Sequence, residues 1–207
     1  MSERPDTGRR VLVLFAHPAL EKSRVNRVLA RAARGLPGVT FHDLYEDYPE
    51  LDICVTDEQR LLAGHEVVVM QHPLYWYSTP AMLKEWQDLV LEHGWAYGRG
   101  GDALRGKLLL NAVTAGGGQE AYSAAGRNRH TVRQLLVPIA RTAQLCGMRY
   151  LAPFVVHGTH SLTAEQIDAA ARDYRRLLEG LRDDRLDLDR AEQQQQLGGD
   201  ATPWRQP

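Results

Sequence analysis

The chain has 207 residues, of which 43% are hydrophobic and 25% charged, so it can bury a full-sized core without disulfides. Its 25 basic and 26 acidic side chains give a net charge of -1, which argues against a general nucleic-acid binder. Cys54 and Cys146 have no metal-ligand spacing, and the first apolar run, residues 11–16, is too short for a signal peptide or a membrane span. We therefore expect a cytoplasmic protein, in which any contact with the inner membrane comes through a partner.

Short apolar runs alternate with amphipathic stretches along the whole chain. The runs predicted as strands are, in chain order, residues 11–16, 39–41, 67–70, 108–113 and 150–156. Most of them are apolar at consecutive positions, which is typical of strands buried on both faces. Pro153 lies in the last run, and because proline lacks the N–H that a central strand needs, we expect this strand at an edge.

Capping residues mark helix starts between the strands. They are Ser23, Thr56 with Gln59, Thr79 before Pro80, and Thr163 with Gln166. Pro138 should kink or split a further helical stretch over residues 131–146.

The alternation of strands and helices predicts an α/β fold with a doubly wound, five-stranded parallel sheet and helices on both faces. Of the common orders of such a sheet we expect 2-1-3-4-5, in which the fifth strand lies at an edge, where Pro153 is tolerated. We expect residues 1–190 to form a single domain. Residues 191–207 contain a glutamine run, Gly198 and Gly199, and are predicted to be a disordered tail.

The loops after strands one, three, four and five are unusual, and the carboxyl ends of parallel strands are where ligands bind. The first of these loops holds His17 and leads through Ser23 into a helix that also carries Asn26. A helix N-terminus with such donors favours an anion, so the loop is a candidate phosphate cradle. The alternative is that Ser23 only caps the helix.

The second loop, residues 71–78, places Leu74, Tyr75, Trp76 and Tyr77 in succession. Neighbouring aromatic rings at a functional edge offer a surface for a flat ligand. The alternative is that these rings seal the end of the core or a subunit interface.

The third loop runs from Thr114 and Ala115 into Gly116 and Gly117, as required where the backbone approaches a ligand closely. A flexible turn would have the same composition. Tyr122 follows and could reach the same edge, although a tyrosine at such a position is commonly an ordinary surface residue.

The histidines offer a rival interpretation, because several of them follow strands and could bind zinc. They are His17, His72, His157 and His160. His17-Pro18 is similar to the His-Pro-Asp-Asp start of metal-dependent deacetylases, but Ala19 and Leu20 stand where the two acids would be. We therefore predict no metal site.

At these loops the sequence resembles the flavodoxin-like NAD(P)H:quinone oxidoreductases. Within them it most resembles the ancillary flavoproteins of glutathione-gated potassium-efflux antiporters. The resemblance covers residues 11–160 and is carried by four blocks in order. They are Ala16-His17-Pro18 with Ser23 and Asn26, residues 71–78 with Pro80 and Leu83-Lys84, residues 93–98, and residues 114–117.

The resemblance implies a flavodoxin-like fold with bound FMN, in preference to FAD. It assigns the phosphate end of the flavin to His17 and to Ser23, Arg24, Val25 and Asn26. It assigns the isoalloxazine to Leu74, Tyr75, Trp76 and Tyr77, and the pyrimidine side of that ring to Thr114, Ala115, Gly116 and Gly117. It also implies a homodimer.

The resemblance further implies that NAD(P)H and a quinone, or a similar small acceptor, occupy one place in turn in a ping-pong, two-electron hydride transfer. The backbone of Gly116 and Gly117 would stabilise negative charge on the flavin. Tyr122 matches a tyrosine that assists hydride transfer in larger quinone reductases. Those larger enzymes also have a histidine six residues beyond that tyrosine. This chain has Asn128 at that position, and His130 lies two residues further on.

Two alternatives remain on the same resemblance. One is a regulatory, flavin-binding subunit of a potassium-efflux antiporter, and the other is an electron carrier without a nicotinamide substrate. Arg127 and Arg129 are candidates for contact with an NADPH 2′-phosphate, although a solvated basic stretch would have the same sequence.

Overall fold

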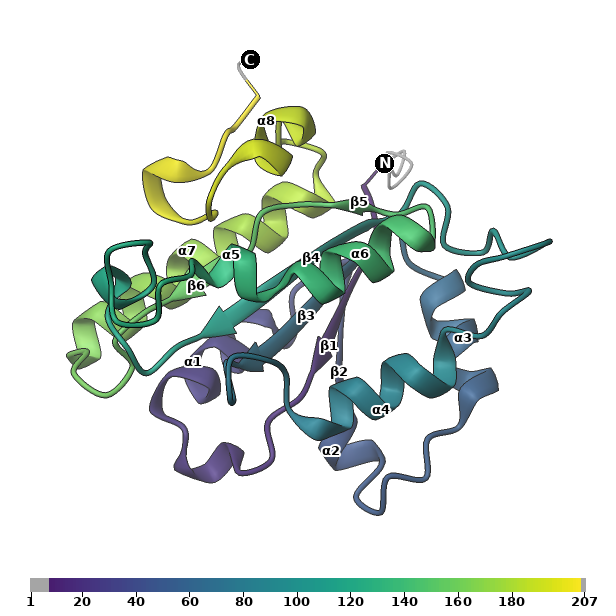
Figure 1. Ribbon diagram of the computed structural model, residues 1–207, viewed down its shortest axis with the longest axis horizontal. Helices are drawn as coiled ribbons and strands as arrows, with labels where there is room; N and C mark the ends of the chain where they lie inside the picture. Colours follow the sequence, from purple (N-terminus) through teal and green to yellow (C-terminus); the bar gives the residue numbers. More distant parts are fainter. Residues whose placement is uncertain (1–7, 206–207) are drawn as a thin grey trace, which may run out of the picture.

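The computed structural model describes residues 8–205, and its centre is one parallel sheet (Figure 1). The strands follow the order β2 Val39–Asp43, β1 Val11–Phe15, β3 Val67–Pro73 and β4 Leu108–Thr114. Beyond β4 lie β5 Arg149–Tyr150 and β6 Phe154–Val156, which both pair with β4. This confirms the predicted order 2-1-3-4-5 and the edge position of the last strand. That strand is divided in two, with Pro153 just before the second piece.

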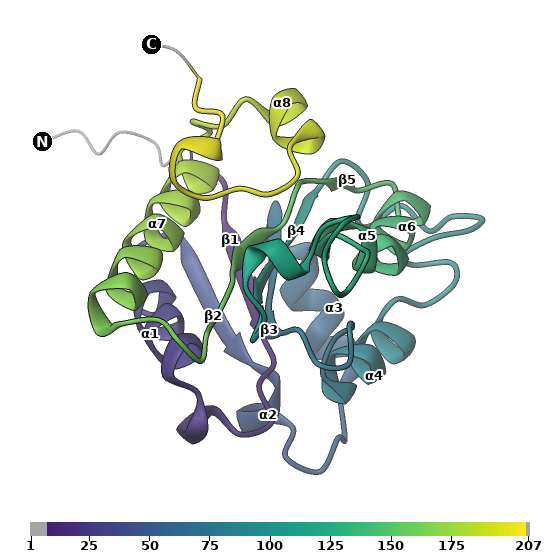
Figure 2. The ribbon, with the colours of Figure 1, turned by 60° about the vertical axis from the view of Figure 1, so that its left-hand side comes forward.

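Helices cover both faces of the sheet (Figure 2). On one face, α1 Arg24–Ala33 packs beside α7 Ala164–Arg182. On the other face lie α2 Leu44–Asp47, α3 Val55–Ala63, α4 Ala81–Val90, α5 Val132–Leu135 and α6 Val137–Leu145. Every residue of β1, β3 and β4 is buried, because these strands are covered on both faces.

The predicted helix starts hold in part. Ser23 caps α1, and Thr163 with Gln166 forms the predicted capping box of α7. The prediction at Thr56 is wrong, because the carbonyl of Cys54 already accepts the first hydrogen bonds of α3 and so places Thr56 inside the first turn. Pro80 is the N-cap of α4 and not its first residue.

The helical stretch around Pro138 is divided, as predicted. Its two parts are α5 and α6, and Pro138 lies in the first turn of α6, where the missing N–H leaves no helical bond unmade.

A buried carboxylate of α3 links that helix to α4, to β2 and to the end of α2. Glu58 of α3 is 1% exposed, and its carboxylate accepts hydrogen bonds from Trp86 Nε1 at 2.8 Å and Tyr48 Oη at 2.7 Å. It also pairs with His42 Nε2 of β2 at 2.7 Å. Burial alone would raise the pKa of Glu58, but these three hydrogen bonds outweigh it and lower the pKa.

Residues 191–205, expected to be disordered, instead pack against the fold. Ala191 in α8 Leu188–Gln193 is fully buried and Leu197 is 1% exposed, while the Trp204 ring lies 4.8 Å from the guanidinium of Arg176. These apolar side chains lie far apart in a polar, glutamine-rich stretch, so the composition of that stretch did not predict its ordered packing. Residues 206–207 of that prediction lie outside the described residues. A short 3₁₀ turn, η3 Gly199–Ala201, follows α8.

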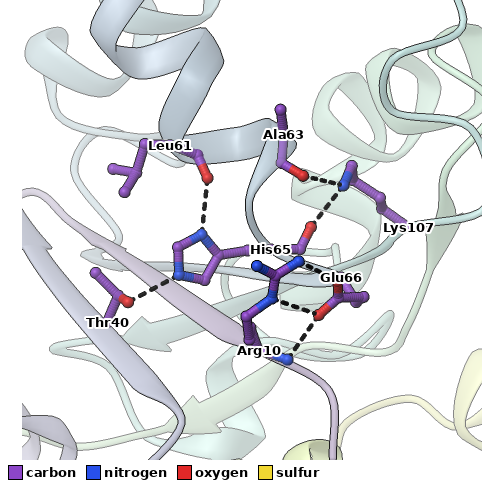
Figure 3. Close-up of polar contacts among 7 residues, drawn as sticks. All are labelled: Arg10, Thr40, Leu61, Ala63, His65, Glu66 and Lys107. Carbon is purple, nitrogen blue, oxygen red and sulfur yellow. Dashed lines mark hydrogen bonds and ion pairs between the residues drawn. The ribbon is translucent and has the colours of Figure 1, made fainter.

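Polar contacts fasten the amino ends of the central strands (Figure 3). Arg10, just before β1, pairs with Glu66, just before β3, at 2.7 Å. The ammonium of Lys107, just before β4, donates to the carbonyls of Ala63 and His65 at 3.2 and 2.7 Å. At this end of the sheet one ion pair joins β1 to β3, and the Lys107 ammonium joins β4 to the backbone before β3. Within residues 8–205, no helix combines the length and the apolar composition needed to cross a bilayer.

Candidate functional site

A cavity of about 690 Å³ opens at the carboxyl ends of β1, β3 and β4. Its volume lies within the range of about 300–1,000 Å³ that is typical of ligand pockets. The lining residues are His17, Lys22, Ser23, Arg24, Val25, Asn26, Pro73, Leu74, Tyr75, Trp76, Tyr77, Thr114, Gly116, Gly117, Tyr122, Arg127, Asn128, Thr159 and His160. None of these lining residues is acidic, and three are permanent cations, so the cavity favours an anionic ligand.

The loop from β1 to α1 begins the cavity. Ser23 Oγ accepts a hydrogen bond from the N–H of Asn26 at 3.1 Å, so Ser23 caps the helix and lines the cavity as well. His17 Nδ1 accepts from the N–H of Ala19 at 3.1 Å. Burial lowers the pKa of His17, and in the neutral ring this contact leaves the proton on Nε2, which can donate to a ligand.

Asn26 has an unused acceptor at the cavity. It is 1% exposed, and its Nδ2 donates to Thr114 Oγ1 at 2.7 Å, which joins the first loop to the end of β4. Its Oδ1 is buried and has no hydrogen-bond partner within residues 8–205. Buried polar atoms are nearly always paired, so this oxygen fits a ligand that carries a hydroxyl donor.

The aromatic loop after β3 contains a strained two-residue turn. Trp76 and Tyr77 both have left-handed backbones, with φ of 49° and 63°, between the mutually bonded Tyr75 and Ser78. A left-handed backbone costs a residue other than glycine about 1–2 kcal/mol. The N–H groups of Trp76 and Tyr77 make no hydrogen bond within the described part of the chain. The turn thus holds two backbone donors and an indole that is 92% exposed at the edge of the cavity.

The side chains of His160 and Tyr122 lie close to the glycine loop after β4. A Cβ at Gly116 would lie 2.7 Å from His160 Nε2, and one at Gly117 would lie 3.2 Å from Tyr122 Cε2. The N–H of Gly158 donates to the carbonyl of Gly117 at 2.9 Å, which ties this loop to the one after β6. The N–H groups of Gly116 and Gly117 have no partner within the described residues, so they remain available to a ligand.

Tyr122 has a different histidine neighbour from the one considered in the sequence. His130 is exposed and its Nδ1 lies 3.1 Å from the carbonyl of Asn128. The imidazole beside Tyr122 is that of His157, after β6, with ring centroids 5.6 Å apart. Burial raises the pKa of Tyr122, and the nearby Tyr77 raises it further.

The structure gathers almost all of the candidate residues at one cavity. Two candidates do not line it: Ala115, which is 1% exposed, and Arg129, which lies on the exposed surface. Sequence reasoning did not assign five lining residues to the site, namely Lys22, Pro73, Asn128, Thr159 and His160. Pro73 lies in the second loop, and Thr159 and His160 lie in the loop after the last strand, residues 157–160. Adjacency to named residues was the only signal for Lys22 and Asn128.

The four histidines of the zinc hypothesis do not come together. His72 is fully buried, with Nδ1 3.0 Å from the carbonyl of Pro73, and burial lowers its pKa to about 4. Across residues 8–205 there is no group of three or more His, Cys, Asp or Glu side chains placed to hold a metal ion.

Comparison with known proteins agrees with this architecture. The family model for the flavodoxin-like fold matches residues 9–178, most of the chain. The chain belongs to the flavodoxin-like family. This flavodoxin-like protein is 45% identical over 165 residues to KefG, an ancillary protein of the glutathione-regulated potassium-efflux system of Serratia proteamaculans. The match covers 80% of this chain and 90% of that relative. The resemblance inferred from the four sequence blocks is therefore confirmed.

Two solved structures extend the comparison. General stress protein 14 from Treponema denticola, in complex with FMN, has a TM-score of 0.80 and 37% identity, and covers 84% of this chain and 99% of its own. An NADPH-quinone reductase from P. pentosaceus has a TM-score of 0.74 and 31% identity, with coverage of 81% and 96%. Both likenesses extend over nearly the whole flavodoxin-like core.

Proposed function

We propose that this flavodoxin-like protein is an FMN-dependent NAD(P)H:quinone oxidoreductase. The observation that carries the proposal is that one cavity combines a cationic helix N-terminus, an exposed aromatic turn and a glycine loop with free N–H groups. The FMN in the structure of the Treponema relative, and the name of the P. pentosaceus reductase, support the same reaction class.

The residues present fit FMN from one end to the other. The phosphate would lie at the start of α1, against His17 Nε2 and the residues from Ser23 to Asn26, where the helix dipole favours an anion. The unpaired Asn26 Oδ1 would accept from a hydroxyl of the sugar-like chain. Residues 74–77 would line the flat ring system, and Thr114, Gly116 and Gly117 would meet its pyrimidine side. We propose FMN in preference to FAD.

The bound flavin would supply two-electron hydride transfer between NAD(P)H and a quinone, which use the same face in turn. The free N–H groups of Gly116 and Gly117 would donate to the carbonyl edge of the ring and stabilise charge that grows there. Tyr122 would orient the substrate through its hydroxyl, and burial raises the pKa of that hydroxyl further above neutral pH. Arg127 lines the same cavity and would favour the phosphates of the nicotinamide substrate.

A second candidate function is regulatory. KefG of Serratia is named as ancillary to a potassium-efflux system, so a role as a flavin-binding subunit on a membrane antiporter is the alternative for this chain. In that role the protein would be cytoplasmic and held peripherally at the inner membrane by its partner. We also propose that it is a homodimer. The two functions are compatible with one cavity.

Purification separates these functions. A reductase is expected to copurify with FMN, identified by chromatography after thermal release, and to oxidise NADPH or NADH rapidly with a benzoquinone. Parallel double-reciprocal lines would support the ping-pong scheme. A yellow protein that is inert toward both nicotinamides would overturn the reductase and favour a sensor or carrier. A colourless protein that does not take up added FMN would overturn the cofactor assignment.

A further inference from the structure

The C-terminal segment, residues 188–204, lies beyond the family match at residues 9–178 but is joined to the edge of the sheet. The N–H of Ala152 donates to the carbonyl of Ala191 at 3.1 Å, and the N–H of Leu197 donates to the carbonyl of Pro153 at 2.8 Å. Leu197 also forms a parallel bridge with Phe154 of β6. The segment therefore pairs with the outer edge that β6 would otherwise present to solvent.

A second set of contacts fixes the same segment from α5. The guanidinium of Arg133 donates to the carbonyls of Glu192 and Gln194. The side chain of Arg149, in β5, pairs with Asp189 and Glu192, each at 2.6 Å. The backbone on either side of Gln196 is thus held, so the position of its side chain is determined by the fold.

Gln196 reaches the wall of the proposed flavin site. Its Oε1 lies 3.2 Å from His157 Nε2, and the His157 ring packs against that of Tyr122 at 5.6 Å between centroids. His157 Nδ1 is buried without a partner within residues 8–205. Gln196 is consequently the only hydrogen-bond partner of the His157 side chain among the described residues.

We infer that Gln196 is a positioning residue for the site, which holds the His157 imidazole against Tyr122 and so fixes the place of the tyrosine ring. The amide oxygen accepts from Nε2–H, which leaves Nδ1 as a bare acceptor in the neutral imidazole. Without that contact the His157 ring can turn about its side-chain torsions, and Tyr122 loses a fixed neighbour. The effect on turnover rests on the proposed reductase function, whereas the effect on the two rings does not.

The carboxylate of Gln196→Glu provides a sharp probe. Burial lowers the pKa of His157, and Gln196 and Glu120 oppose that shift. A carboxylate at the amide position favours the imidazolium, so Gln196→Glu is expected to raise the pKa of His157. Gln195→Glu is the matched control, because it makes the same charge change at an exposed neighbouring residue with no side-chain hydrogen bond in the described part of the chain.

The experiment uses the full-length protein with and without FMN. NMR titration follows the His157 ring and the Tyr122 ring in the wild type, Gln196→Glu, Gln196→Leu and Gln195→Glu. We expect Gln196→Glu to move the midpoint seen at both rings, and Gln195→Glu to leave it in place. In the reductase assay, Gln196→Leu should lower kcat about fivefold, the size expected for one hydrogen bond, with little change in KM or in FMN affinity.

Two results would overturn the inference. One is a His157 midpoint that moves equally in Gln196→Glu and Gln195→Glu, and the other is a Tyr122 ring whose signals ignore the state of His157. If the wild type reduces no quinone, the proposed function fails, but the titration of the two rings in the absence of FMN still decides the role of Gln196.

Discussion

The side-chain amide of Asn26 donates to the hydroxyl of Thr114 at 2.7 Å, and this bond joins the first turn of α1 to the last residue of β4. Both side chains are buried, and both line the cavity. Phosphate-binding and ring-binding parts of the proposed flavin site are therefore coupled by one hydrogen bond. A substitution of either Asn26 or Thr114 should therefore affect both parts of the site.

Asn26→Ala is expected to weaken FMN binding about tenfold, equivalent to about 1.4 kcal/mol, because it removes the Asn26 Oδ1 acceptor. It should also lower the free energy of unfolding by about 1–3 kcal/mol, since Thr114 Oγ1 is left buried without its partner. Flavin fluorescence titration and urea unfolding measure the two effects. Arg27→Ala, an exposed change in the same helix, is the control. Wild-type affinity in Asn26→Ala would exclude contact of this oxygen with the flavin.

Trp76→Asn should stabilise the protein while impairing the site. Asparagine tolerates the left-handed backbone that Trp76 adopts at φ 49°, so the free energy of unfolding should rise by about 1 kcal/mol. Loss of the exposed indole should lower turnover with the quinone. Tyr75→Asn is a useful comparison, because Tyr75 is in the same turn without a positive φ. If Trp76→Asn lowers the urea midpoint instead, the turn is not a store of strain.

Tyr122→Phe should lower kcat about tenfold or more without loss of bound FMN, because only the hydroxyl is removed and the ring still packs against His157. Stopped-flow reduction by NADPH isolates the first half of the reaction. Unchanged kinetics in both half-reactions would remove Tyr122 from the list of catalytic residues and leave it a wall of the cavity.

The pair of Glu58 and His42 should shape the dependence of stability on pH. The lowered pKa of Glu58 gives stability that is present above its unfolded value of about 4.3 and is lost as the pH falls through the folded pKa. Burial lowers the pKa of His42, but the hydrogen bond and charge of Glu58, with Asp47, raise it overall. His42 therefore gives stability that is complete below about 6.5 and is lost as the pH rises through its folded pKa.

Glu58→Gln should flatten both limbs of that profile and lower the maximum stability by about 1–3 kcal/mol. Urea unfolding from pH 4 to pH 9 tests it, with Glu85→Gln as an exposed control on α4. A profile for Glu58→Gln that keeps the wild-type decline above neutral pH would show that another group causes it.

The parallel sheet was predictable because β1, β3 and β4 are largely apolar at consecutive positions. The order 2-1-3-4-5 is one of the common orders of such a sheet, and Pro153 agrees with it because it restricts the last strand to an edge. The convergence of the loops follows from that order alone. The start of α3 was not predictable, because Thr56 has the chemistry of a cap and only backbone hydrogen bonds to Cys54 show otherwise.

The contacts that surround Tyr122 could not be predicted from the sequence for a different reason. His157 and Gln196 are both distant from it in sequence, and no local pattern relates them. The order in residues 191–205 was hidden because Leu197 stabilises the segment through contacts with β6 and not through its own composition. Backbone pairing with the edge of a sheet requires no particular side chains, so the composition of a glutamine-rich run does not predict it.

The pairing of Leu197 with Phe154 also has a consequence for the order in which the molecule is completed. Residues 188–204 are synthesised after every strand and after α7, so the sheet and the loops of the cavity can assemble before this segment is available. Gln196 lies in this late segment, so its contact with His157, which packs against Tyr122, can form only after the strands and α7 have been synthesised. A nascent chain can thus form the cavity before Gln196 is available to contact His157.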